Sequence, residues 1–158
     1  MPTTPLMDVS TLDLDNPVGD TEEIQRHCKQ RGRLALVDDI VHYGTDPDVV
    51  AGTKKLSEDD WWCTDHIPGR PIFPGVLMIE GAAQLCTYDY MRRQDEHERF
   101  LGFGGVDGVR FRGVVEPPGR IIYVCKAKRL RRSTFTYEAQ GFSEGKLVFE
   151  AVILGVVI

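Results

Sequence analysis

The pattern of apolar and polar positions makes the second half of the chain strand-like. From Phe100 to the end, apolar stretches are separated by short turn signals rich in Pro, Gly, Ser and Arg. The predicted strands are residues 100–113, 120–130, 133–143 and 146–157, and the turns lie at 117–119, 131–133 and 143–145. This half of the chain is therefore predicted to form a meander of long strands.

The first half of the chain begins with residues 1–19, which lack periodicity and are rich in Pro, Asp and Thr. We expect either a disordered extension or a strap over the surface. Asp20 or Thr21 then caps a short predicted helix that runs to about Gln30. A predicted hairpin follows, with strands at 34–43 and 48–56 joined by the turn signal Gly44-Thr45-Asp46-Pro47.

A stiff loop and an apolar helix connect the two halves. Residues 66–75, HIPGRPIFPG, contain prolines and glycines that exclude both a helix and a central strand. Residues 76–91, VLMIEGAAQLCTYDYM, read as a helix that is apolar nearly all round and is therefore expected to be buried. A curved antiparallel sheet wrapped around the helix would bury it, and that arrangement is the hotdog fold. The sequence thus predicts a single α+β hotdog domain over residues 20–158.

Composition and charge exclude several classes of protein. A chain of 158 residues fits one domain, and its formal net charge of -5 argues against a nucleic-acid binder. The chain has no stretch of 18 apolar residues, so no membrane span is predicted. The cysteines are widely spaced, and the N-terminus has no signal-peptide pattern, so we expect a cytoplasmic protein. Cys63 and His66 have C-x2-H spacing without a second ligand pair, so no metal site is predicted.

Glu80 is an unusual residue in the apolar helix. A buried, unpaired carboxylate is costly, and burial favours its protonated form, which suits a general acid. Gln84 lies four residues further along, on the same helix face, where its amide can hold the carboxyl group. The alternative is a structural glutamate that reaches an exposed edge of the helix or pairs with an arginine.

His66 opens the stiff loop that leads into this helix. A loop histidine is usually only a polar surface residue, but the prolines here fix its position, as a general base requires. Gly75 and Val76 would present unpaired backbone N–H groups at the start of the helix, where they suit a thioester oxygen that gains negative charge. A glycine at position 75 would also let a substrate approach the backbone closely. Together these residues predict proton abstraction followed by elimination.

The segment HIPGRPIFPGVLMIEGAAQ resembles the signature of the FabZ/FabA group of (3R)-hydroxyacyl-acyl carrier protein dehydratases. That signature begins with a histidine, which is followed by a Pro-Gly pair. The glycine of a second Pro-Gly pair comes nine residues after the histidine, and an acidic residue comes fourteen residues after the histidine. His66, Gly75 and Glu80 match this spacing, and Gln84 matches a glutamine of the family helix. The acidic residue of this chain, Glu80, is a glutamate and in this resembles the FabZ type. Flanking segments, EEIQRHCKQRGRLALVDDIV and GVDGVRFRGVVEPPGRI, extend the resemblance over roughly residues 20–158.

This resemblance implies a mechanism, a partner and an assembly. His66 would remove the C2 proton of a hydroxyacyl chain, and Glu80, oriented by Gln84, would protonate the departing C3 hydroxyl. The N–H of Gly75, helped by that of Val76, would hold the thioester oxygen. The substrate would be carried by acyl carrier protein in fatty acid biosynthesis, and no metal or other cofactor would be required. Members of the group build each site from two subunits of a dimer, and such dimers often assemble into hexamers.

A run of basic residues suggests where an acidic carrier protein would dock. The candidate docking residues are Lys126, Lys128, Arg129, Arg131 and Arg132, helped by Arg110 and Arg112. The alternative is an ordinary solvated strand end and turn.

Two other functions remain open at the level of sequence. One is a hotdog thioesterase or a polyketide-type dehydratase, although thioesterases of this fold generally lack the paired histidine and helix acid. The other is a catalytically silent acyl-binding hotdog protein. Asp65 and Ile67, which stand where the FabZ/FabA group usually has Gly and Phe, keep this last alternative open.

Overall fold

The computed structural model describes residues 3–45, 48–94 and 98–158. Within these ranges, one antiparallel sheet has the strand order β1-β2-β4-β5-β6-β3. Its strands are β1 (Asp39–Tyr43), β2 (Val49–Leu56), β3 (Leu101–Phe111), β4 (Gly119–Leu130), β5 (Thr134–Ser143) and β6 (Lys146–Val157). The helices are α1 (Thr21–His27), α2 (Trp62–Asp65) and α3 (Gly75–Gln94), with single 3-10 turns at Val9–Thr11 and Gly32–Leu34.

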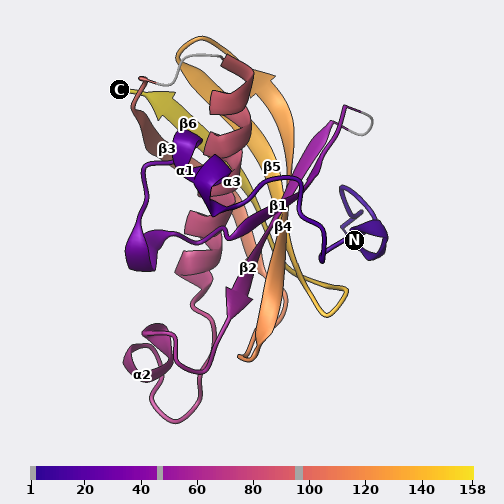
Figure 1. Cartoon of the computed structure of the whole chain (residues 1–158), viewed down its shortest axis with the longest axis vertical. Helices are drawn as coiled ribbons and strands as arrows, with labels where there is room; N and C mark the ends of the chain where they lie inside the picture. Colours follow the sequence, from indigo (N-terminus) through magenta and orange to yellow (C-terminus); the bar gives the residue numbers. More distant parts are fainter. Residues whose placement is uncertain (1–2, 46–47, 95–97) are drawn as a thin grey trace.

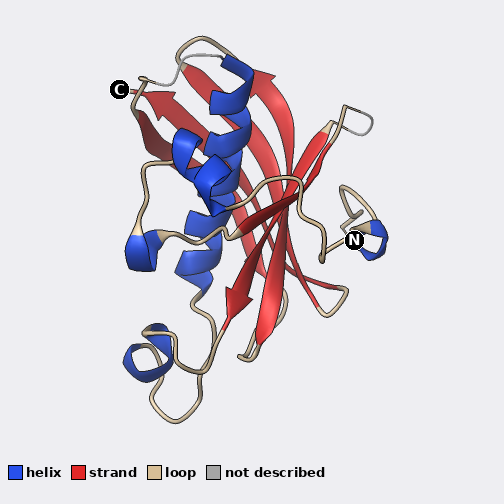
Figure 2. Ribbon diagram, in the orientation of Figure 1, coloured by secondary structure: helices blue, strands red, loops and turns tan. Residues whose placement is uncertain are grey.

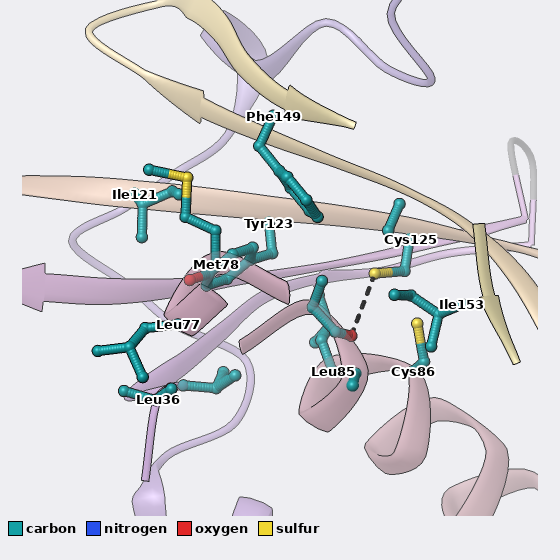
Figure 3. Close-up of a cluster of buried hydrophobic side chains, with 14 of the residues drawn as sticks. Leu36, Leu77, Met78, Leu85, Cys86, Ile121, Tyr123, Cys125, Phe149 and Ile153 are labelled. Atoms are coloured by element: carbon teal, nitrogen blue, oxygen red, sulfur yellow. Dashed lines mark hydrogen bonds between the residues drawn. The ribbon is translucent and has the colours of Figure 1, made fainter. Parts of the chain in front are cut away.

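The long helix α3 lies against one face of the curved sheet (Figures 1 and 2). Most of its residues are buried, as its nearly all-round apolar sequence predicts. Figure 3 shows Leu77, Met78 and Leu85 of α3 beside side chains of the sheet, among them Ile121 and Phe149. The predicted α+β hotdog architecture, a sheet wrapped around a buried helix, is confirmed.

Gly81 of α3 lies directly against the side chain of Tyr123. A Cβ atom at this position would lie 2.5 Å from the hydroxyl oxygen of Tyr123 on β4, so only glycine fits without a shift. Tyr123 is completely buried, and burial raises the pKa of its phenol well above the usual value. This contact sets the depth at which the first turns of α3 sit in the sheet.

The N-terminal segment lies as a strap on the opposite, outer face of the sheet (Figure 1). Gln140 of β5 holds it, because its side-chain oxygen accepts from the N–H of Leu6 at 2.8 Å and its amide donates to the carbonyl of Thr4 at 3.0 Å. Apolar residues of the strap, Leu6, Met7, Val9, Leu12 and Leu14, pack against an outer cluster made of Val41, Val49, Ala51, Ile122, Val124 and Phe142.

The order of the strands differs from the predicted simple meander. β4, β5 and β6 pair in succession, but β3 pairs with β6 at the far edge, and β4 pairs instead with β2. The prediction of consecutive pairing from residue 100 onward was therefore wrong for β3. Local alternation gives the length of a strand but carries no information about its neighbour.

The first predicted strand is shorter than expected, and one short helix was missed. β1 begins only at Asp39, because the N–H of Leu36 and the carbonyl of Leu34 are bound by the side chain of Gln84 instead of by another strand. α1 is capped by Asp20, as expected, but ends at His27. Residues Trp62–Asp65 form α2, where no helix was predicted. Asp46 and Pro47 of the predicted hairpin turn lie outside the described residues.

Candidate active site

Glu80 and Gln84 interact directly on one face of α3. The Nε2 atom of Gln84 donates a hydrogen bond of 2.9 Å to Oε1 of Glu80. Glu80 is half-buried rather than fully buried, so the carboxyl group sits at the margin of the core. In the described residues its second oxygen, Oε2, has no hydrogen-bond partner and is available to a ligand.

The position of the Gln84 amide is fixed by the segment that precedes β1. Its Nε2 also donates to the carbonyl of Leu34 at 2.6 Å, and its Oε1 accepts from the N–H of Leu36 at 2.9 Å. If the amide were flipped, its NH2 group would face the N–H of Leu36 and its oxygen would face the carbonyl of Leu34, and neither pair could form a hydrogen bond. The network therefore determines that Nε2 faces Glu80. Gln84 is 3% exposed, and these bonds use both hydrogens of its amide.

A small cavity of about 50 Å³ adjoins Glu80 and Gln84. It lies between α3 and the strands β3, β5 and β6. Its lining residues are Gln30, Glu80, Ala83, Gln84, Thr87, Leu101, Gly102, Phe103, Phe135, Ile153, Leu154 and Gly155. An acid at the margin of a cavity lined by both polar and apolar side chains is an arrangement that suits a ligand with an apolar chain and one polar reacting group.

His66 is placed differently from Glu80. It caps the C-terminus of α2, it is exposed, and it is not among the residues that line the Glu80 cavity. Its Nδ1 atom lies 3.0 Å from the carbonyl oxygen of Ile72 in the same loop. Because a carbonyl only accepts, Nδ1 carries the hydrogen, and in the neutral ring Nε2 is then an unprotonated base. The loop thus orients the histidine, but within one chain the structure does not bring it into the Glu80 cavity.

The start of α3 has the predicted backbone geometry for Gly75 and Val76. The carbonyl of Pro74 accepts from Leu77 at 3.0 Å and from Met78 at 3.2 Å, so the two preceding N–H groups lie before the first helical bonds. The reason for glycine at position 75 differs from the expected one. A Cβ atom there would lie 2.7 Å from the ring of Phe111, so the glycine accommodates a side chain of β3 rather than leaving open space for a substrate.

The candidate docking residues do not form one cluster. Arg110 and Arg112 lie near the start of α3, where Phe111 contacts Gly75, and Arg112 is paired with Glu150 at 2.6 Å. Arg131 and Arg132 lie near the other end, where their carbonyls accept from the hydroxyl of Tyr90. From Gly75 to Tyr90 the helix rises roughly 22 Å.

The other basic residues of the run sit on β4. Lys128 is paired with Glu138 at 2.8 Å, and Lys126 lines a groove beside the strap. Arg129, Arg131 and Arg132 are exposed at the β4–β5 end of the sheet. This last group presents three exposed guanidinium side chains at one end of the sheet.

Of the residues that line this cavity, sequence reasoning named only Glu80 and Gln84; Gln30, Thr87 and Phe135 are among those it missed. Thr87 follows Glu80 by seven residues, and helical periodicity could have placed it on the same face. Gln30 and Phe135 are distant in sequence, and no local pattern marks them. The Oε1 atom of Gln30 is buried and has no hydrogen-bond partner among the residues that the structure describes, so it is a polar group directed into the protein interior.

A nearby cysteine is not a candidate nucleophile. The thiol of Cys28 donates to the carbonyl oxygen of Gln84 at 3.4 Å, and burial raises the pKa of this thiol to about 12. Cys63 and His66 gain no further ligands, and among the described residues no three His, Cys, Asp or Glu side chains converge as a metal site. No helix in the described parts of the chain is long and apolar enough to cross a membrane.

Residues 29–152 match the family described as the FabA-like domain. The chain belongs to this family. A relative from Campylobacter jejuni strain 81-176, named 3-hydroxyacyl-acyl-carrier-protein dehydratase FabZ, is 33% identical over 143 residues, which is 88% of this chain and 97% of the relative. A relative of the same name from Janthinobacterium sp. strain Marseille is 30% identical over 138 residues, 85% of this chain and 88% of its own. The predicted membership of the FabZ-type dehydratases is confirmed.

Solved structures resemble this member of the family in fold. The dehydratase heterocomplex ApeI:P from Xenorhabdus doucetiae aligns with a TM-score of 0.72 at 12% identity, over 85% of this chain and 90% of that one. A mutant thioesterase from Pseudomonas aeruginosa aligns with a TM-score of 0.65 at 16% identity, over 89% of this chain and 95% of that one. One fold thus carries both a dehydratase and a thioesterase, so the reaction depends on the residues at the site.

Proposed function

We propose that this protein is a 3-hydroxyacyl-acyl carrier protein dehydratase of fatty acid biosynthesis. It converts a (3R)-hydroxyacyl thioester into a trans-2-enoyl thioester and water. The observation that carries this proposal is the Glu80 carboxyl group, held by Gln84 beside a small cavity under α3, in a chain of the FabA-like family.

The proposed step uses one base, one acid and one oxyanion site. Nε2 of His66 removes a proton from C2, and the electron pair of that C–H bond becomes the C2–C3 double bond. The C3–O bond breaks, and Glu80 gives its proton to the departing oxygen, which leaves as water. The histidine is then protonated and the glutamate ionised, and proton exchange with water restores both residues.

Backbone N–H groups at the start of α3 complete the proposed chemistry. Charge develops on the thioester oxygen as C2 loses its proton, and the N–H of Gly75, with that of Val76, would bind that oxygen. Their position before the first helical hydrogen bonds supports this role, because they have no acceptor within the helix. The step moves protons and breaks one C–O bond, so neither a redox group nor a metal is part of it.

We further propose that each active site forms between two copies of the chain. His66 does not line the Glu80 cavity, so a single chain leaves the base and the acid apart. β3 is an edge strand of 11 residues, with Phe103 and Phe111 each about half exposed. A long apolar edge strand is a favourable surface for pairing with a second copy. A homodimer formed through β3 would bring the His66 loop of one copy to Glu80 of the other; hexamers of such dimers remain a prediction.

The natural substrate is proposed to arrive on acyl carrier protein, docked by Arg129, Arg131 and Arg132. These exposed side chains would attract the acidic surface of such a carrier. The protein is proposed to act in the cytoplasm, where Cys28, Cys63, Cys86 and Cys125, which are all free and buried, would stay reduced.

The decisive experiment measures reversible hydration of a trans-2-enoyl thioester. We expect activity in the wild type, and a loss of roughly 100-fold or more in His66→Ala and in Glu80→Gln, because each removes a group that transfers a proton. Glu116→Gln, at an exposed glutamate, is the matched control and should keep full activity. Circular dichroism would verify that all variants are folded.

Three outcomes would contradict the proposal. A wild type that binds acyl thioesters without hydrating them would be a silent acyl-binding protein. Cleavage of the thioester without hydration would be a thioesterase reaction. Full hydration activity in either site variant would remove that residue from the mechanism.

A further inference from the structure

The cavity beside Glu80 has a defined direction along α3. The residues that α3 contributes, Glu80, Ala83, Gln84 and Thr87, are spaced so that they form one stripe of the helix. The stripe starts at the acid and runs toward the C-terminus of the helix. An acyl chain whose C3 lies at Glu80 would therefore extend its remaining carbons toward Thr87.

Phe135 of β5 stands at the end of this stripe. Its ring lies 4.9 Å, centroid to centroid, from that of Tyr90, which follows Thr87 on α3. Phe135 is 2% exposed and also packs edge-on against Tyr137, with centroids 5.4 Å apart. The ring thus belongs at once to the cavity wall and to the core of the protein.

The ring of Phe135 cannot easily move aside. Gly155, its partner in register on β6, has no side chain, and a Cβ atom there would overlap the ring. The ring therefore occupies the space that a side chain at 155 would fill, and the two tyrosines hold it from other directions. Movement to another rotamer would require several core residues to shift.

The cavity is small for a hydrocarbon chain. Its volume is about 50 Å³. A cavity that binds benzene is roughly 150 Å³, and one water molecule accounts for roughly 30 Å³ in the liquid. The part of the pocket that one chain lines beyond Glu80 is therefore about one third of the volume that binds benzene.

We propose that Phe135, seated on Gly155, is a specificity-determining residue that closes the acyl pocket and restricts the enzyme to short-chain hydroxyacyl thioesters, with four carbons preferred over eight. This inference rests on the proposed dehydratase function. Phe135 acts by its volume alone and takes no part in the proton transfers. A smaller side chain at 135 would lengthen the pocket toward Tyr90.

The test compares four-carbon and eight-carbon trans-2-enoyl thioesters of the same carrier as substrates for hydration. In the wild type we expect kcat/KM to favour the four-carbon substrate by at least roughly tenfold, a typical discrimination by pocket size. In Phe135→Ala the ratio of eight-carbon to four-carbon kcat/KM should rise by at least roughly tenfold. Phe135→Leu, which keeps most of the core volume, should move the ratio in the same direction and decides the question if the alanine variant does not fold.

Phe142→Leu is the matched control. Phe142 lies on the same strand and is also buried, but it belongs to the outer cluster under the strap. Its substitution should leave the ratio unchanged. A wild type that hydrates the eight-carbon substrate as well as the four-carbon one would overturn the inference while leaving the dehydratase function intact, as would an unchanged ratio in folded Phe135 variants. Absence of hydration at both lengths would overturn the proposed function and this inference with it.

Discussion

The side chain of Gln84 connects the candidate acid to the segment before β1. Its Nε2 lies 2.9 Å from Oε1 of Glu80 and 2.6 Å from the carbonyl oxygen of Leu34. The same amide thus replaces the strand hydrogen bonds of residues 34–36 and fixes the rotation of the Glu80 carboxyl group. Stability and positioning of the acid depend on one residue, and substitutions can separate the two effects.

Gln84→Leu should lower both stability and turnover. Leu36 N–H and Leu34 C=O would lose their partner, which should reduce the free energy of unfolding by about 1–3 kcal/mol in a denaturant titration. Glu80 would lose its orienting contact, so kcat should fall by up to roughly 100-fold while KM changes little. Gln94→Leu, at the last residue of α3, is the control. Equal changes in kcat for both variants would contradict a positioning role.

Mixed dimers provide a test of the shared active site. His66→Ala and Glu80→Gln chains, each inactive alone, should regain about one quarter of wild-type activity when unfolded and refolded together in equal amounts. Half of such dimers would contain both chains, and each of these would have one intact site of two. A site contained within one chain would give no recovery, which refutes the shared site but not the reaction.

Arg131 and Arg132 should affect only carrier-bound substrate. The Arg131→Ala/Arg132→Ala variant is expected to raise KM for an acyl carrier protein substrate several-fold, and more so at low salt, because the attraction is between exposed charges. KM for the same acyl group on coenzyme A should not change. Lys146→Ala, at the exposed first residue of β6, serves as control. An equal rise for both substrates would exclude docking at this place.

Gln140 should control the strap over the outer face of the sheet. Gln140→Ala removes the acceptor of Leu6 N–H and the donor to Thr4 C=O, and should lower the free energy of unfolding by about 1–3 kcal/mol. Limited proteolysis should then cut the strap faster than in the wild type. Thr4→Ala is the control, because only the backbone carbonyl of Thr4 is used. Unchanged proteolysis in Gln140→Ala would mean that the apolar contacts alone retain the strap.

Several features follow from the sequence because they depend on neighbours along the chain. The apolar stretch from Val76 to Met91 requires a buried helix, and Asp20 marks the start of α1 by its capping side chain. The prolines between His66 and Gly75 exclude regular structure, and the spacing of Glu80 and Gln84 places both on one helix face. Spacing also identified the family, although the roles of His66 and Glu80 remain predictions.

Other features were decided by contacts between distant residues. The late start of β1 depends on a side chain about 50 positions away, and the placement of β3 beside β6 depends on how the sheet closes around α3. Position 75 requires a glycine because the ring of Phe111 occupies the space of a side chain there. Phe135 forms part of the cavity wall because its ring fills the space that a side chain at Gly155 would take. Periodicity along a chain determines which face of an element is apolar, whereas close packing in three dimensions determines which side chains meet across it.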